Sequence, residues 1–77
     1  MDQLDRITFD PQIMGGKACI RGLRVTVALL LNLVANGMTT AEIVEAYPYL
    51  EAEDVRQALQ YGAFLADEQI DFLPVAR

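Results

Sequence analysis

A chain of 77 residues has room for one domain, and 53% hydrophobic residues is a high fraction for a domain of this size. We therefore expect a homodimer, or a complex with another protein, to cover the surplus apolar surface. The net charge of −5 divides unevenly: residues 1–26 hold four bases and three acids, whereas residues 27–77 hold two bases and eight acids. An acidic body with a basic arm suits a basic protein partner and is a poor non-specific binder of nucleic acid.

The composition also argues against several classes of protein. A single cysteine excludes an internal disulfide and suits a reducing cytosol, so we expect a cytoplasmic protein. The first residues are acidic and polar, which is not typical of a signal peptide. The longest apolar run, residues 27–35, is broken at Asn32 and is shorter than the ~20 residues that span a bilayer. We expect no membrane association.

Enzymatic chemistry finds little support in the residues. Without histidine there is no ordinary catalytic triad and no Cys/His zinc site. Gly16-Lys17 is not a phosphate-binding loop, because Ala18 stands where Ser or Thr is needed. Cys19 lies in an apolar run and is interpreted as a buried structural thiol. We expect no enzyme, no cofactor and no metal.

The chain divides into an N-terminal β arm (1–26), a three-helix body (27–66) and a tail (67–77), which together form one domain. After a frayed start at residues 1–6, a short strand is predicted at residues 7–9, because the run is β-branched or aromatic. Glycines 15 and 16 predict a turn. Two extended runs follow, at 18–20 and 23–25, with a tight reversal at Arg21-Gly22 between them. This arrangement is expected to bring together three bases: Lys17, Arg21 and Arg24.

The first helix is predicted from about Val27 to Asn36, with Thr26 as its N-cap and Gly37 as its C-cap. It is apolar nearly all round, so it is expected to be covered on more than one side. It is interpreted as a central core helix, one side of which also forms a dimer interface. The interface candidates are Leu29, Leu30 and Leu33.

Two further helices follow. Thr39 and Glu42 form a capping box that begins a short helix, which ends at about Ala46 because Pro48 follows. A third helix is predicted over residues 52–66. Its apolar stripe comprises Val55, Ala58, Leu59, Gly62 and Leu65. Gly62 costs a helix ~1 kcal/mol against alanine, which a close helix crossing would explain.

The tail is mixed, and its apolar residues are expected to pack on the body or to contact a partner. Its acids, Asp67, Glu68 and Asp71, could bind a metal but are interpreted as a solvated helix end.

Three helices with a short second one resemble a helix-turn-helix unit. The third helix would then read DNA, but two acids, Glu53 and Asp54, are predicted to be exposed near its start and would repel phosphates. The exposed N-terminal set is expected to comprise Glu53, Asp54, Arg56 and Gln57. If DNA is bound, the basic arm is the better candidate. The alternative is that Arg21 and Arg24 pair with acids of the body or of a second subunit, and spacing alone leaves both interpretations open.

Several segments resemble, in order and spacing, the family catalogued as domain of unknown function 433. The resemblance covers roughly residues 5–65 and is carried by residues 7–11, 15–27, 37–43, 47–48 and 53–55. Three positions depart from the usual pattern: Ala18 stands where proline is common, Leu23 where threonine is common, and Glu51 where a Ser/Thr helix cap is common.

The resemblance implies a homeodomain-like three-helix fold with an N-terminal β arm, so the expected class is a mostly helical small α+β domain. Many members of the family are described as antitoxins, often encoded beside a PIN-like nuclease-type protein. Such antitoxins bind and silence their toxin and can repress their own operon.

The leading hypothesis is therefore an antitoxin-like regulator. Its acidic and apolar surface, with Glu53 and Asp54, would mask a basic nuclease-like toxin, while the basic arm orders a dimer or touches operator DNA. Two alternatives stay open: a DNA-binding transcriptional regulator without a toxin, and a purely structural interaction module.

Overall fold

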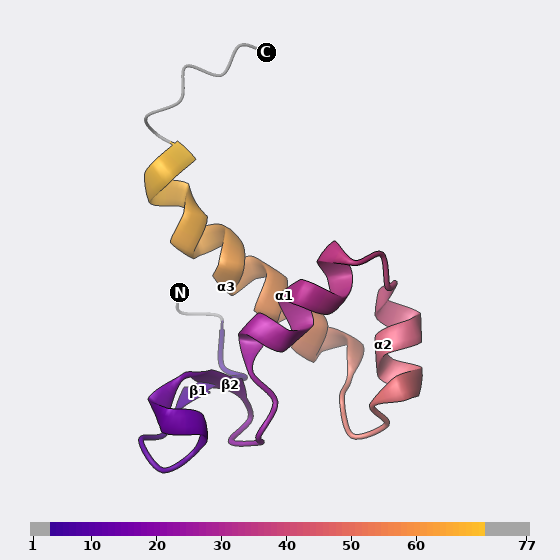
Figure 1. Ribbon diagram of the computed structural model, residues 1–77, viewed down its shortest axis with the longest axis horizontal. Helices are drawn as coiled ribbons and strands as arrows, with labels where there is room; N and C mark the ends of the chain where they lie inside the picture. Colours follow the sequence, from indigo (N-terminus) through magenta and orange to yellow (C-terminus); the bar gives the residue numbers. More distant parts are fainter. Residues whose placement is uncertain (1–3, 71–77) are drawn as a thin grey trace.

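The computed structural model describes residues 4–70 and shows three helices with a two-stranded antiparallel hairpin on the N-terminal side (Figure 1). This is the predicted small α+β fold. The elements in chain order are β1 (Ile7–Phe9), the short 3₁₀ turn η1 (Met14–Gly16), β2 (Ala18–Ile20), α1 (Val27–Ala35), α2 (Thr40–Ala46) and α3 (Ala52–Ile70).

The hairpin pairs β1 with β2 so that Ile7 lies opposite Ile20. The chain then reverses at Arg21-Gly22, where both residues have positive φ (48° and 71°) and the Leu23 amide donates to the Ile20 carbonyl at 2.7 Å. These are the features of a tight primed turn, so the predicted reversal is confirmed. The predicted extended run at residues 23–25 is wrong as a strand, because beyond β2 the ladder continues only as an isolated bridge from Cys19 to Thr26.

The helix starts follow their local signals. The Thr26 hydroxyl accepts from the Leu29 amide at 3.0 Å, which confirms the predicted N-cap of α1. Both halves of the predicted capping box of α2 are present, with the Thr39 hydroxyl and the Glu42 carboxylate each accepting from the other residue's amide. α1 ends one residue earlier than predicted, at Ala35, and Gly37 follows with φ of 100°.

α3 is longer than predicted and continues to Ile70 rather than ending at Ala66. Its C-terminal end runs beyond α1 and the hairpin (Figure 1), and residues 63–67 are exposed. Leu65, which was predicted to be on the buried stripe, is consequently 53% exposed, and Leu59 is also exposed. Residues 71–77 of the predicted tail lie outside the described part. No helix within that part is both long and apolar enough to cross a membrane.

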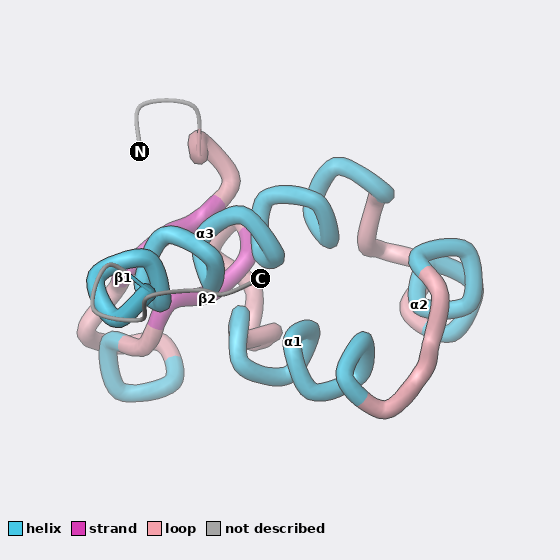
Figure 2. Tube along the Cα trace, turned by 90° about the horizontal axis from the view of Figure 1, so that it is seen from above, coloured by secondary structure: helices cyan, strands magenta, loops and turns pink. Residues whose placement is uncertain are grey.

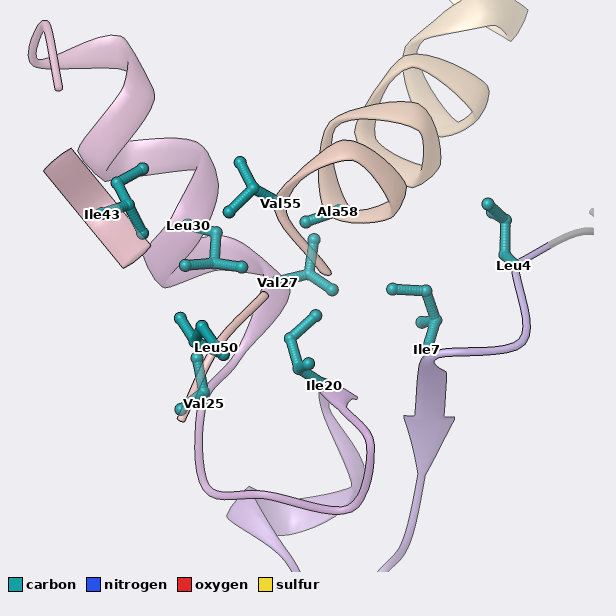
Figure 3. Packing of buried hydrophobic residues seen from close by; sticks show 10 residues of the cluster. All are labelled: Leu4, Ile7, Ile20, Val25, Val27, Leu30, Ile43, Leu50, Val55 and Ala58. Carbon is teal, nitrogen blue, oxygen red and sulfur yellow. The ribbon is translucent and has the colours of Figure 1, made fainter. Parts of the chain in front are cut away.

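The core lies where the hairpin and all three helices meet (Figure 3). Seen from above, α1 and α3 lie opposite each other while α2 closes one end (Figure 2). Burial of these apolar side chains is the main source of stability, at roughly 25 cal/mol per Å² removed from water. The cluster comprises Leu4, Ile7, Ile20, Val25, Val27, Leu30, Ile43, Leu50, Val55 and Ala58.

α1 and α3 approach each other most closely at Gly62. A Cβ placed on Gly62 would lie 3.1 Å from each δ-methyl group of Leu31 on α1. This close contact confirms the helix crossing that the glycine predicted, and it explains why a residue with poor helix propensity stands in the middle of α3.

Candidate partner-binding surfaces

A buried carboxylate joins the arm to the body. Asp54, in the first turn of α3, has 0% of its surface exposed. Its Oδ1 accepts from Nε of Arg21 and from Nη1 of Arg6, both at 3.0 Å, and its Oδ2 accepts from Nη2 of Arg21 at 2.9 Å. The Glu51 amide also donates to Oδ2 at 2.8 Å. Asp54 therefore caps α3 and fixes both arginines of the hairpin at once.

This environment keeps Asp54 ionised. Burial opposes the charged form, but hydrogen bonds from Arg21, the Glu51 amide and Arg6 outweigh burial and lower the pKa of Asp54 below its ordinary value. Asp54 thus supplies one half of a capping box at the start of α3, in which its carboxylate accepts from the Glu51 amide. The other half, from the Asp54 amide to a Ser/Thr hydroxyl, is absent with Glu51 at this position, and the Asp54 amide donates to the Glu51 carbonyl at 2.9 Å instead.

The predicted exposure of the α3 N-terminus is wrong for two of four residues. Asp54 and Gln57 are buried, because the hairpin lies over this part of the helix. Gln57 is held by the start of the arm: its Oε1 accepts from the Arg6 amide and its Nε2 donates to Asp5, both at 2.9 Å. Asp54 therefore cannot contribute to a surface that masks a basic partner.

The remaining exposed residues of this region neutralise one another. Arg56 donates to both carboxylate oxygens of Glu53, at 2.8 and 2.6 Å, and to Gln60 at 2.7 Å. These bonds from Arg56, and one from Gln57, lower the pKa of Glu53 to about 2. The first two turns of α3 thus present no free cation to phosphate and only a compensated anion to a basic partner.

The three bases of the arm have different surroundings. Arg21 is committed to Asp54 and also donates to the Tyr49 carbonyl at 2.7 Å, so of the two interpretations left open, pairing with the body holds for Arg21. Arg24 and Lys17 form no ion pair with any described side chain, and both are exposed. Nη1 of Arg24 donates to the Met14 sulfur at 3.9 Å, and the backbone amide of Lys17 donates to the Met14 carbonyl at 3.3 Å, so both residues lie beside η1.

The proposed dimer leucines on α1 are mostly engaged inside the molecule. Leu30 is fully buried in the core, so it is wrong as an interface residue. Leu29 and Leu33 are half-buried and pack against the same core. Neither residue belongs to the exposed large hydrophobic side chains, which comprise Phe9, Met14, Tyr49, Leu59, Phe64 and Leu65.

Acidic and aromatic side chains are also exposed on α2 and in the loop that follows it. α2 exposes Glu42 and Glu45, and the loop that follows exposes Tyr49, 54% of which is accessible. The Tyr49 ring is fixed edge-on against Tyr47, with the ring centroids 6.2 Å apart. No lysine or arginine occurs between Arg24 and Arg56 in the sequence. We call Glu42, Glu45 and Tyr49 the α2 surface.

A second surface is apolar. A groove of about 290 Å³ runs between β2, the start of α1 and α3, and Lys17 is the only charged residue among those that line it. The lining comprises Lys17, Ala18, Thr26, Val27, Ala28, Leu31, Tyr61 and Leu65. Beside it, Phe9 packs edge-on against Tyr61, with centroids 6.0 Å apart, and Phe64 is 50% exposed. We call the groove with Phe9 and Phe64 the groove surface.

Sequence reasoning missed Arg6, Gln57 and the groove. Arg6 lies in the segment that was expected to be frayed, and no local pattern pairs it with an acid 48 residues away. Cys19 is buried, as interpreted. Among the described side chains, no group of three His, Cys, Asp or Glu residues is placed to hold a metal ion. Asp71 of the acidic tail lies outside the described residues.

Comparison with known proteins identifies close relatives. The family model described as "Protein of unknown function (DUF433)" matches residues 7–62. The uncharacterized protein y4eO of Sinorhizobium fredii is 40% identical over 56 residues, which cover 73% of this chain and 25% of that protein. A crystal structure of a DUF433 member from Anabaena variabilis superposes with a TM-score of 0.71 at 36% identity, covering 86% of this chain and 64% of that one. This chain therefore spans only a quarter of y4eO.

Proposed function

We propose that this chain, which belongs to the DUF433 family, is an antitoxin-like regulator that binds and neutralises a PIN-like nuclease-type toxin. The resemblance to the family implies this role, because many of its members are described as antitoxins. The observation that carries the proposal is the α2 surface. It combines an exposed tyrosine with uncompensated carboxylates, and it lies in a stretch of sequence without any cation.

The chemistry of this surface fits a basic protein. Tyrosine supplies a large, rigid contact area and is enriched among the residues that dominate binding energy. Unpaired carboxylates around it steer a positively charged partner and accelerate association. A nuclease site that holds phosphates is such a partner. Covering that site would silence the enzyme without any catalytic step on the part of this chain.

Binding to DNA is the second candidate, and the observation in its favour is the pair of uncompensated bases, Lys17 and Arg24, beside Met14. In this alternative the arm contacts operator phosphate and the chain acts as a transcriptional regulator, with or without a toxin. The outward face of α3 is the weaker candidate because Arg56 is tied to Glu53 and Gln60.

A tagged pull-down from the native cell, with protein and DNA both identified, tests the proposal. Recovery of a nuclease-type protein by the wild type, and its loss with Glu45→Lys plus Tyr49→Ser, is the expected result. Asp10→Lys is the matched control, because Asp10 is an exposed acid in the loop that follows β1. The hairpin lies away from α2 (Figure 1). Recovery of DNA without a protein partner would favour the regulator. Recovery of neither would leave a structural interaction module.

A further inference from the structure

The groove surface is an open, mostly apolar feature among residues 4–70, and it shares no residue with the α2 surface. It also combines a hollow with exposed apolar side chains. The groove provides a hollow, while Phe64 and Leu65, each about half exposed, provide a ridge on the part of α3 that extends beyond the body. A two-fold dimer requires this combination, because the same patch must serve on both subunits.

We infer that a second copy of this chain covers the groove surface, with the two α3 helices packed antiparallel about a two-fold axis near Leu65. In this arrangement the ridge of each copy lies against the groove of the other. The dimer face therefore lies on α3 and the start of α1, rather than on the leucines of α1 that were first predicted.

Charge favours a copy of this chain over an unrelated apolar partner. Lys17 is the single charged residue of the groove lining, and it forms no ion pair with a described side chain. In the sequence, the residues that follow Leu65 carry three acids within six positions and no base until Arg77. Asp67, two residues after Leu65, is exposed, and an antiparallel arrangement brings it toward the Lys17 side of the other copy, so that cation and acid face each other across the interface.

The location of the exposed rings supports the same face. Phe9 and Tyr61 form an edge-on pair at the border of the groove, so their contact area is already rigid before association. Such preorganised aromatic residues lose little conformational freedom on binding. Leu31, which lines the groove, also contacts Gly62, where α1 and α3 lie close together.

The test is sedimentation equilibrium of the purified chain, with Leu65→Gln and the matched control Leu59→Gln. Both positions are exposed leucines of α3, but Leu59 lies about 120° around the helix from Leu65. We expect a wild-type dimer, a dimer dissociation constant at least about tenfold weaker for Leu65→Gln, and no change for Leu59→Gln. A monomeric wild type, or equal dissociation by both variants, would overturn the inference.

Cross-linking provides a readout that does not depend on a destabilising change. With a short thiol-specific cross-linker, Leu65→Cys is expected to give a covalent dimer and Leu59→Cys is not, since Cys19 is buried and unreactive. A covalent dimer from Leu59→Cys alone would place the interface elsewhere. Because these experiments use the chain alone, their failure would leave the toxin proposal standing, and a failed toxin pull-down would leave the dimer standing.

Discussion

Arg21 and Asp54 form a side-on ion pair in which Nε and Nη2 of the arginine each donate to a different carboxylate oxygen, at 3.0 and 2.9 Å. Arg21 holds this position from a backbone conformation with positive φ, at the tip of the turn after β2. The pair links residues 33 positions apart and fixes the β arm over the start of α3. It is the structural reason why the arm cannot be treated as a free basic segment.

Replacing Asp54 with alanine should destabilise the fold. The substitution removes the side-chain cap of α3 and leaves two arginines without their shared anion, although both guanidinium groups remain accessible to water. We expect a loss of roughly 2–3 kcal/mol in the free energy of unfolding, measured by urea denaturation. Glu45→Ala, which removes an exposed carboxylate, is the control and should change little. Equal stability of the two variants would contradict the anchoring role of Asp54.

The fold should lose stability in acid. The pKa values of Asp54 and Glu53 are lowered in the folded chain, that of Glu53 from 4.5 to about 2, so the unfolded chain takes up protons first as the pH falls. Stability is therefore complete above about pH 5 and declines as the pH falls toward about 2. Asp54→Asn should reduce this dependence. Urea midpoints of the wild type and the variant, measured at several pH values, check both expectations. A wild-type midpoint that stays constant down to about pH 3 would contradict the predicted loss of stability in acid.

Gly62 should tolerate alanine but not leucine. Alanine improves the helix propensity by ~1 kcal/mol, while its Cβ crowds the Leu31 methyl groups, which can shift toward the adjoining groove. These effects oppose each other, so Gly62→Ala should stay within about 1 kcal/mol of the wild type. Gly62→Leu forces α1 and α3 apart and should cost about 1–3 kcal/mol in thermal or urea unfolding. A leucine variant as stable as the wild type would disprove the close crossing.

Any affinity for DNA should depend on Lys17 and Arg24. Alanine at both positions is expected to weaken binding to DNA from upstream of the gene. The slope of the logarithm of the binding constant against the logarithm of the salt concentration should become less steep by about two, one for each lost phosphate contact. Arg56→Ala serves as the control, because Arg56 is tied to Glu53. Arg21→Ala is unsuitable as a probe of phosphate contact, since it also breaks the pair with Asp54. An unchanged slope in the double variant would remove the arm from this role.

Local signals predicted most of the fold. The Thr26 cap, the Thr39–Glu42 capping box and the Arg21-Gly22 turn each depend on residues a few positions apart, so the sequence shows them directly. The site depends on distant contacts. Spacing alone could not show that Asp54 faces inward, because an acid in the first turn of a helix is ordinarily exposed and stabilised by the helix dipole.

The other errors concern which faces of the helices are covered by neighbouring elements. Periodicity placed Leu65 on the buried stripe of α3, but periodicity identifies a face and not what covers it. Similarly, Leu30 belongs to a helix that is apolar all round, and only the packing of α2 and α3 decides which of its sides are buried. The groove surface arises from three separate elements and therefore has no signal in any one segment.

The most direct test of the proposed function is an inhibition titration. The nuclease-type partner is isolated, and its activity is measured as the chain is added. We predict that the wild type and Asp10→Lys abolish the activity near equimolar ratio, whereas Glu45→Lys with Tyr49→Ser requires a large excess while remaining folded. Undiminished nuclease activity at a saturating concentration of the wild type, or equal inhibition by all three proteins, would contradict neutralisation through the α2 surface.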